Sequence, residues 1–128
     1  MKKNKLTIRI NKPISKVFDF TINPENTPRW IDFIVEETID SNEIKIGTHY
    51  KNKDKDGNIH VYELTQFERN KVFELQSLPS HYTVKYTYAP ISDIETELEY
   101  FEWVDFDELN SPFPISAMQK LKEVLEAE

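Results

Sequence analysis

One glutamate and one histidine are the side chains best placed for acid–base chemistry in this sequence. Glu102 follows Leu98 and Tyr100 at the two-residue spacing of a strand, which directs its carboxylate toward the interior. Because a buried carboxyl group resists ionisation, an inward Glu102 is a candidate general acid or base. A bulge at residues 101–103 would instead turn Trp103 inward and Glu102 outward. We favour the bulge, because desolvating a lone carboxylate costs several kcal/mol.

His60 is the second catalytic candidate, but the histidines do not have the spacing of a metal site. Of the three histidines, only His60 shares the inward phase of its segment. One histidine among scattered acids is a poor zinc site, and the chain contains no cysteine to supply thiolates. The serines lack the G-x-S-x-G setting of a nucleophile elbow. We therefore interpret His60 as a hydrogen-bonded core residue, and we expect no metal and no cofactor.

Residues 52–63 have part of the spacing of an EF-hand calcium loop. Asn52, Asp54, Asp56, Gly57 and Glu63 occupy loop positions 1, 3, 5, 6 and 12. An EF-hand needs a helix on each side, whereas both flanks here alternate as strands do. Asp-Gly between alternating segments is also a strong hairpin signal. We predict a hairpin tip without metal, in which Gly57 has a positive φ.

Tyrosines dominate the inward phase of the alternating segments, while the opposite phase is charged. A tyrosine presents a large apolar ring and one hydroxyl that needs a partner when buried, which suits an amphipathic cavity. The alternative is that aromatic residues favour strands and simply fill the core. The candidate ligand contacts on the strands are Tyr62, Tyr82, Tyr86 and Tyr100.

The elements that must position these side chains follow from the periodicity of the apolar residues. The alternation of Leu6, Ile8 and Ile10 predicts a first strand, and helical spacing after Pro13 predicts a helix. A second, short helix follows Pro24 and ends near Trp30. The period of two then predicts strands with short links, and thus an antiparallel meander, over residues 44–53, 58–67, 72–77, 82–88 and 94–104.

A last helix is predicted from Pro114 to Leu125, with one apolar face. This face should lie against the concave side of the sheet and leave a cavity beside it. Met118 and Leu121 on this face are therefore further candidate ligand contacts.

Composition excludes several classes of function. The chain has 128 residues, 16 Lys and Arg against 23 Asp and Glu, and a net charge of −7, which disfavours nucleic acid and anionic membranes. Glycine occurs only at 47 and 57, so neither a dinucleotide fingerprint nor a P-loop can be written. The longest apolar run is three residues, so we expect no membrane segment and a cytoplasmic location. The cations Lys5 and Arg9 should face the acids Glu95, Glu97 and Glu99 if the first and last strands pair.

Four segments in this order resemble one superfamily. NKPISKVF at 11–18, NPENTPRW at 23–30, IGT at 46–48 and LKEVLE at 121–126 resemble the polyketide cyclase/dehydrase branch of the START-like, helix-grip (SRPBCC) superfamily. The resemblance implies a single α+β domain over residues 1–128. It implies a curved antiparallel sheet of about six to seven strands wrapped around the C-terminal helix, with two short helices after the first strand and an apolar cavity. It also implies that Trp30 packs where the short helix caps the sheet; the alternative is that Trp30 is a platform for a ligand.

Three functions are compatible with this fold, and the sequence does not indicate an oligomeric state. The first is binding of a small hydrophobic or polycyclic ligand without chemistry. The second is a cyclase/dehydrase-like enzyme, in which Tyr62, Tyr86 or His60 orients a polyketide-like substrate and Glu102 moves a proton. The third is a chaperone-type interaction module with a filled interior and an exposed apolar patch. We place binding first, because the inward phase is rich in aromatic residues and poor in acid–base pairs.

Overall fold

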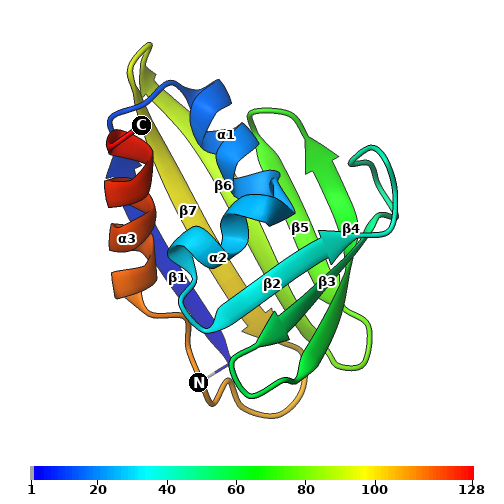
Figure 1. Cartoon of the computed structure of the whole chain (residues 1–128). Helices are drawn as coiled ribbons and strands as arrows, with labels where there is room; N and C mark the ends of the chain where they lie inside the picture. Colours follow the sequence, from blue (N-terminus) through cyan, green and yellow to red (C-terminus); the bar gives the residue numbers. More distant parts are fainter. Residues whose placement is uncertain (1) are drawn as a thin grey trace.

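Seven antiparallel strands form one curled sheet in the computed structural model, which describes residues 2–128 (Figure 1). The strand order is β1-β7-β6-β5-β4-β3-β2, so the first strand closes onto the last and the rest form a meander. The expected α+β helix-grip architecture is confirmed. The strands are β1 (Lys3–Ile10), β2 (Ile34–Ile39), β3 (His49–Asp54), β4 (Ile59–Glu68), β5 (Val72–Ser77), β6 (Tyr82–Ser92) and β7 (Glu95–Val104).

The helices gather on the concave side of this sheet (Figure 1). They are α1 (Ile14–Ile22), the 3₁₀ turn η1 (Pro24–Asn26), α2 (Thr27–Trp30) and α3 (Ile115–Glu126). Helix α3 lies against β1 and α2, and it buries Met118, Leu121 and Leu125. Burial of each of these side chains contributes about 2 kcal/mol, which holds the helix on the sheet. No helix among residues 2–128 has the length and apolar character needed to cross a membrane.

Helices α1 and α2 pack where their apolar spacing predicts. Val17 and Phe18 of α1 are fully buried, and the Phe18 ring meets Tyr88 of β6 edge-on at 5.0 Å between centroids. Trp30 of α2 is 1 % exposed and packs edge-on against Tyr86 and Phe113, as expected for a residue that covers the sheet.

Strand β2 is the one strand of residues 2–128 that the sequence analysis missed. A register shift between Ile34 and Glu36 interrupts its pairing with β3, so Val35 and Glu36 are both exposed. A bulge of this kind breaks the alternation by which strands are recognised. The strand carries Glu37, which lines a cavity on the concave side of the sheet.

The pairing of the first and last strands is confirmed, but the expected charge ladder is mostly absent. Strand β1 pairs with β7 along its whole length, and Lys5 Nζ lies 3.8 Å from a Glu99 carboxylate oxygen. Arg9 faces Glu97 in register, yet no ion pair joins them in the described part of the chain. Because the Lys5–Glu99 pair is largely exposed, solvent screening keeps its contribution small.

The β3–β4 hairpin has the tip that the Asp-Gly signal predicts. Gly57 has a φ of +85°, a conformation that residues with a Cβ rarely adopt. One carboxylate oxygen of Asp54 accepts hydrogen bonds from the backbone N–H groups of Asp56 and Asn58, both at 2.9 Å. The side chain of Asp54 therefore stabilises the turn itself.

Candidate ligand-binding site

A cavity of about 470 Å³ lies between the concave face of the sheet, strand β2 and the segment that leads into α3. This volume falls within the range of small-molecule sites in proteins. Six aromatic side chains line it: Phe33, Tyr62, Tyr82, Tyr86, Tyr100 and Phe113. Its polar lining includes Glu37, Asn52, Asp54, His60 and Glu102.

The four tyrosines predicted from the strand pattern all reach this cavity. Tyr86 and Tyr100 are buried, whereas Tyr62 and Tyr82 are half-buried toward the opening. Tyr86 stacks on Phe73 of β5 at 4.3 Å between ring centroids, and Tyr100 stacks on Phe113 at 4.2 Å. These stacked pairs fix the ring positions and give the cavity rigid walls. Their contact with a ligand stays a prediction.

The tyrosine hydroxyls remain protonated in this environment and differ in their partners. Burial, followed by the negative charges of Glu37 and Glu102, raises the pKa of Tyr62 to about 12. Burial also raises the pKa of Tyr86 well above its ordinary value. Among the described residues, the hydroxyls of Tyr62 and Tyr86 have no hydrogen-bond partner, whereas that of Tyr82 donates to Glu102 at 2.7 Å. Two hydroxyls thus retain hydrogen-bonding capacity.

Glu102 faces inward, so the bulge favoured at residues 101–103 is wrong. Strand β7 pairs without a register shift through this position, opposite Asn4 on one side and Val84 on the other. The side chain is 1 % exposed and accepts hydrogen bonds from Asn4 Nδ2 at 2.8 Å, the Tyr82 hydroxyl at 2.7 Å and the Phe113 backbone N–H at 2.5 Å. These three donors replace water around the carboxylate. Glu102 therefore fastens the segment before α3 to β1, β6 and β7.

Glu37 on β2 is a second carboxylate at the cavity, and the sequence analysis did not find it. Thr27 Oγ1 donates to one of its oxygens at 2.6 Å, and Asn52 Nδ2 donates to the other at a long 3.4 Å. Burial raises the pKa of Glu37 above its ordinary value, and these two hydrogen bonds oppose the rise. The carboxylate is thus desolvated but incompletely paired. The bulge in β2 hid it, because only Glu37 and Ile39 keep the inward alternation after it.

The expectation that His60 is a core residue is wrong, because His60 lies at the rim of the cavity. Its side chain is 47 % exposed, and Nε2 lies 3.0 Å from a carboxylate oxygen of Asp54. The residue pairs with Asn52 at the start of β4, beside the hairpin tip, where the sheet has little to cover it. The hydrogen bond with His60 is the main reason that the pKa of Asp54 lies below its ordinary value.

Met118 and Leu121 do not line the cavity, contrary to the expectation from the helix pattern. Both side chains are fully buried in the core between α3 and the sheet. The wall on this side comes instead from residues 111–114, which precede α3. The helix supports this wall but does not reach the cavity with these two side chains.

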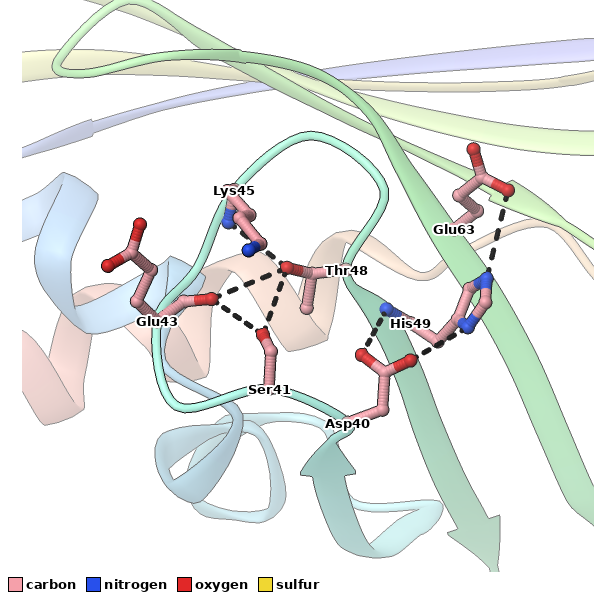
Figure 2. A network of polar contacts seen from close by, with 7 residues as sticks. All are labelled: Asp40, Ser41, Glu43, Lys45, Thr48, His49 and Glu63. Atoms are coloured by element: carbon pink, nitrogen blue, oxygen red, sulfur yellow. Dashed lines mark hydrogen bonds and ion pairs between the residues drawn. The ribbon is translucent and has the colours of Figure 1, made fainter.

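A second polar cluster lies outside the cavity, in the loop between β2 and β3 (Figure 2). Asp40 accepts from the His49 backbone N–H at 2.9 Å and lies 2.9 Å from the His49 ring, whose other nitrogen is 3.8 Å from Glu63. The Thr48 hydroxyl accepts from the Lys45 backbone N–H at 3.0 Å. We call this set the loop network; its members are Asp40, Ser41, Glu43, Lys45, Thr48, His49 and Glu63.

Searches by sequence and by structure gave different results. No protein-family model matches the sequence, and no curated protein matches it. Among solved structures, a START superfamily protein from Mycobacterium smegmatis superposes with a TM-score of 0.77 at 12 % identity and covers 99 % of both chains. Protein XoxI from Bacillus cereus gives a TM-score of 0.75 at 11 % identity, over 98 % of this chain and 96 % of its own.

A third neighbour, Ara h 8.0201, gives a TM-score of 0.67 at 13 % identity over 98 % of both chains. At such identities the likeness concerns the fold, and function must be argued from the site. The chain therefore shares the helix-grip fold of a START superfamily protein, and its own cavity lies between the sheet and the segment before α3.

Proposed function

We propose that this protein binds a small hydrophobic or polycyclic molecule in the cavity between the sheet and the segment before α3. The supporting observation is the cavity of about 470 Å³, with rigid aromatic walls and a few convergent polar groups. Flat walls of this kind accept a planar apolar molecule, and the free hydroxyls of Tyr62 and Tyr86 can orient it. An open interior also favours ligand binding over a chaperone-type module, for which we expected a filled one.

A second candidate is a polyketide cyclase/dehydrase-like enzyme, and one observation favours it. The cavity holds an ionisable group with other polar groups in reach, which a pure binder does not need. Glu37 suits proton transfer better than Glu102, because burial raises the pKa of Glu37 above its ordinary value and one of its oxygens is weakly paired. Glu102 is already held by three donors, which suits a structural role.

The test is a titration with an environment-sensitive apolar dye. Wild-type protein should give saturable fluorescence enhancement, and Tyr86→Trp should weaken binding at least about tenfold because the larger ring fills the cavity. Phe101→Trp is the matched control, since Phe101 lies on the opposite face of β7 and outside the cavity. Thermal unfolding establishes that each variant folds, and Tyr62→Trp at the opening serves as a milder obstruction.

Equal binding by wild type and both obstructed variants would refute this site. Absence of saturable binding by wild type would also refute it. Conversion of a polyketide-like substrate by wild type, lost in Glu37→Gln, would place the enzyme first.

A further inference from the structure

The charges around the cavity all have the same sign. Glu37, Asp54 and Glu102 line it, whereas no lysine or arginine of the described chain does. The whole chain adds a net charge of −7. Desolvation is the main cause that raises the pKa of Tyr62 and of Tyr86, and the negative charges of Glu37 and Glu102 raise both pKa values further. The electric field of these two carboxylates therefore reaches the aromatic walls. An anionic ligand would pay both desolvation and repulsion here.

Two groups at the cavity retain hydrogen-bonding capacity. The Tyr86 side chain is 6 % exposed and lines the cavity, yet its hydroxyl has no partner among residues 2–128. This oxygen is not among the fully buried polar atoms that lack a partner in the described chain, which are Trp30 Nε1 and Asn70 Oδ1, so it is accessible from the cavity and open to a ligand. Glu37 is the other, because Asn52 reaches its second oxygen only at 3.4 Å. Both groups can accept a hydrogen bond, whereas no lysine or arginine of the described chain lines the cavity and His60 of the lining is already engaged by Asp54.

From this combination we propose that the ligand is an arylalkylamine bound in its protonated form, with its rings between the tyrosines and its ammonium group at Glu37. The proposal rests on the proposed function and specifies its ligand class. Aromatic faces attract a cation, and the carboxylate of Glu37 supplies the opposite charge. An ammonium group carries several donors, which can satisfy the second oxygen of Glu37 and a tyrosine hydroxyl together.

The burial of Glu37 also favours a ligand with a positive charge. Desolvation opposes ionisation of Glu37 in the free protein, and a cation beside it would offset that cost. Glu102 contributes less to direct contact, because its oxygens already accept three hydrogen bonds. Asp54 at the opening adds to the attraction of a cation during entry.

Three probes that share one ring system and differ in charge test this proposal: 1-naphthylmethylamine, 1-naphthol and 1-naphthoate. Dissociation constants are measured at neutral pH and moderate salt by calorimetry or by displacement of the apolar dye. Wild type should bind the amine about tenfold or more tightly than naphthol, and should bind naphthoate most weakly. This ranking uses wild-type protein and does not depend on the folding of any variant.

Glu37→Gln should reduce the affinity for the amine to within about threefold of that for naphthol, and leave naphthol nearly unchanged. Asp40→Asn is the matched control, because it removes the same charge from the loop network, outside the cavity. The control should keep the wild-type preference for the amine.

The outcomes separate the two proposals. If naphthol or naphthoate binds wild type as tightly as the amine, the assignment of an amine is overturned while the cavity remains a binding site. A uniform loss of preference in Glu37→Gln and Asp40→Asn would likewise overturn it, because net charge alone would then explain the effect. If no probe and no dye binds, the proposed function itself fails.

Discussion

The loop network and the cavity use the same kinds of side chain but leave them in different states. In the loop network, Asp40 is engaged twice by His49, and the partners lie nine residues apart in the chain (Figure 2). In the cavity, Glu102 is held by Asn4, which lies 98 residues away, and Glu37 is only partly held. The loop network thus closes its own turn, while the cavity keeps acceptors that are not used.

This difference shows why a count of polar residues does not locate a binding site. Exposed carboxylates that are paired within a loop contribute to its conformation and have water as a competitor for any ligand. Desolvated groups with unfilled hydrogen-bonding capacity interact more strongly, because the surrounding dielectric is low. The cavity therefore has the physical properties of a site, and the loop network has those of a structural turn.

Replacement of Glu102 should have the largest effect on stability. Glu102→Ala removes the common acceptor of three donors, of which the Phe113 backbone N–H is buried. We expect the free energy of unfolding in urea to fall by about 3 to 5 kcal/mol. The comparison is Glu63→Ala in the loop network, where the glutamate is partly exposed and 3.8 Å from His49. A similar small loss in both variants would contradict the structural role of Glu102.

Removal of the Thr48 hydroxyl should have a smaller effect, confined to the loop. Thr48 is 2 % exposed, and its hydroxyl accepts from the Lys45 backbone N–H at 3.0 Å. Thr48→Val keeps the shape of the side chain and should lower the free energy of unfolding by about 1 to 2 kcal/mol. Dye binding in the cavity should remain at the wild-type level. Weakened dye binding would show that the loop network and the cavity are coupled.

The smallest expected effects are those of pH on the free energy of unfolding. They should have opposite signs for Glu37 in the cavity and Asp40 in the loop network. Burial raises the pKa of Glu37 above 4.5, so its contribution to stability is fully present below the unfolded pKa and is lost as pH rises through the folded pKa. The hydrogen bond from the His49 backbone lowers the pKa of Asp40 below 3.8, so its contribution is present above the unfolded pKa and is lost as pH falls through the folded pKa.

Urea unfolding of Glu37→Gln and Asp40→Asn across this range measures both signs. Relative to wild type, Glu37→Gln should gain stability as pH rises from acid toward neutral, whereas Asp40→Asn should lose it. Parallel pH profiles for the two variants would contradict the difference in burial.

The sequence predicted the cavity walls better than it predicted the polar groups within them. Alternation on β4, β6 and β7 placed four tyrosines on the concave face, because side chains of a regular strand must alternate. Regularity fails at the β2 bulge, which concealed Glu37, and at the start of β4, where His60 is exposed. Glu102 was placed outward because its compensating donors come from Asn4, Tyr82 and the Phe113 backbone, which only the folded chain brings together.

The most direct test of ligand binding in the cavity is an amide chemical-shift titration of ¹⁵N-labelled protein with 1-naphthylmethylamine. Ring currents from a bound naphthalene should shift amides near Tyr86, Tyr100 and Phe113 in a saturable manner, and leave residues 40–49 of the loop network nearly unchanged. The same titration of Tyr86→Trp should lose these shifts. Largest shifts in residues 40–49, or weak shifts spread over the surface without saturation, would contradict a ligand site in the cavity.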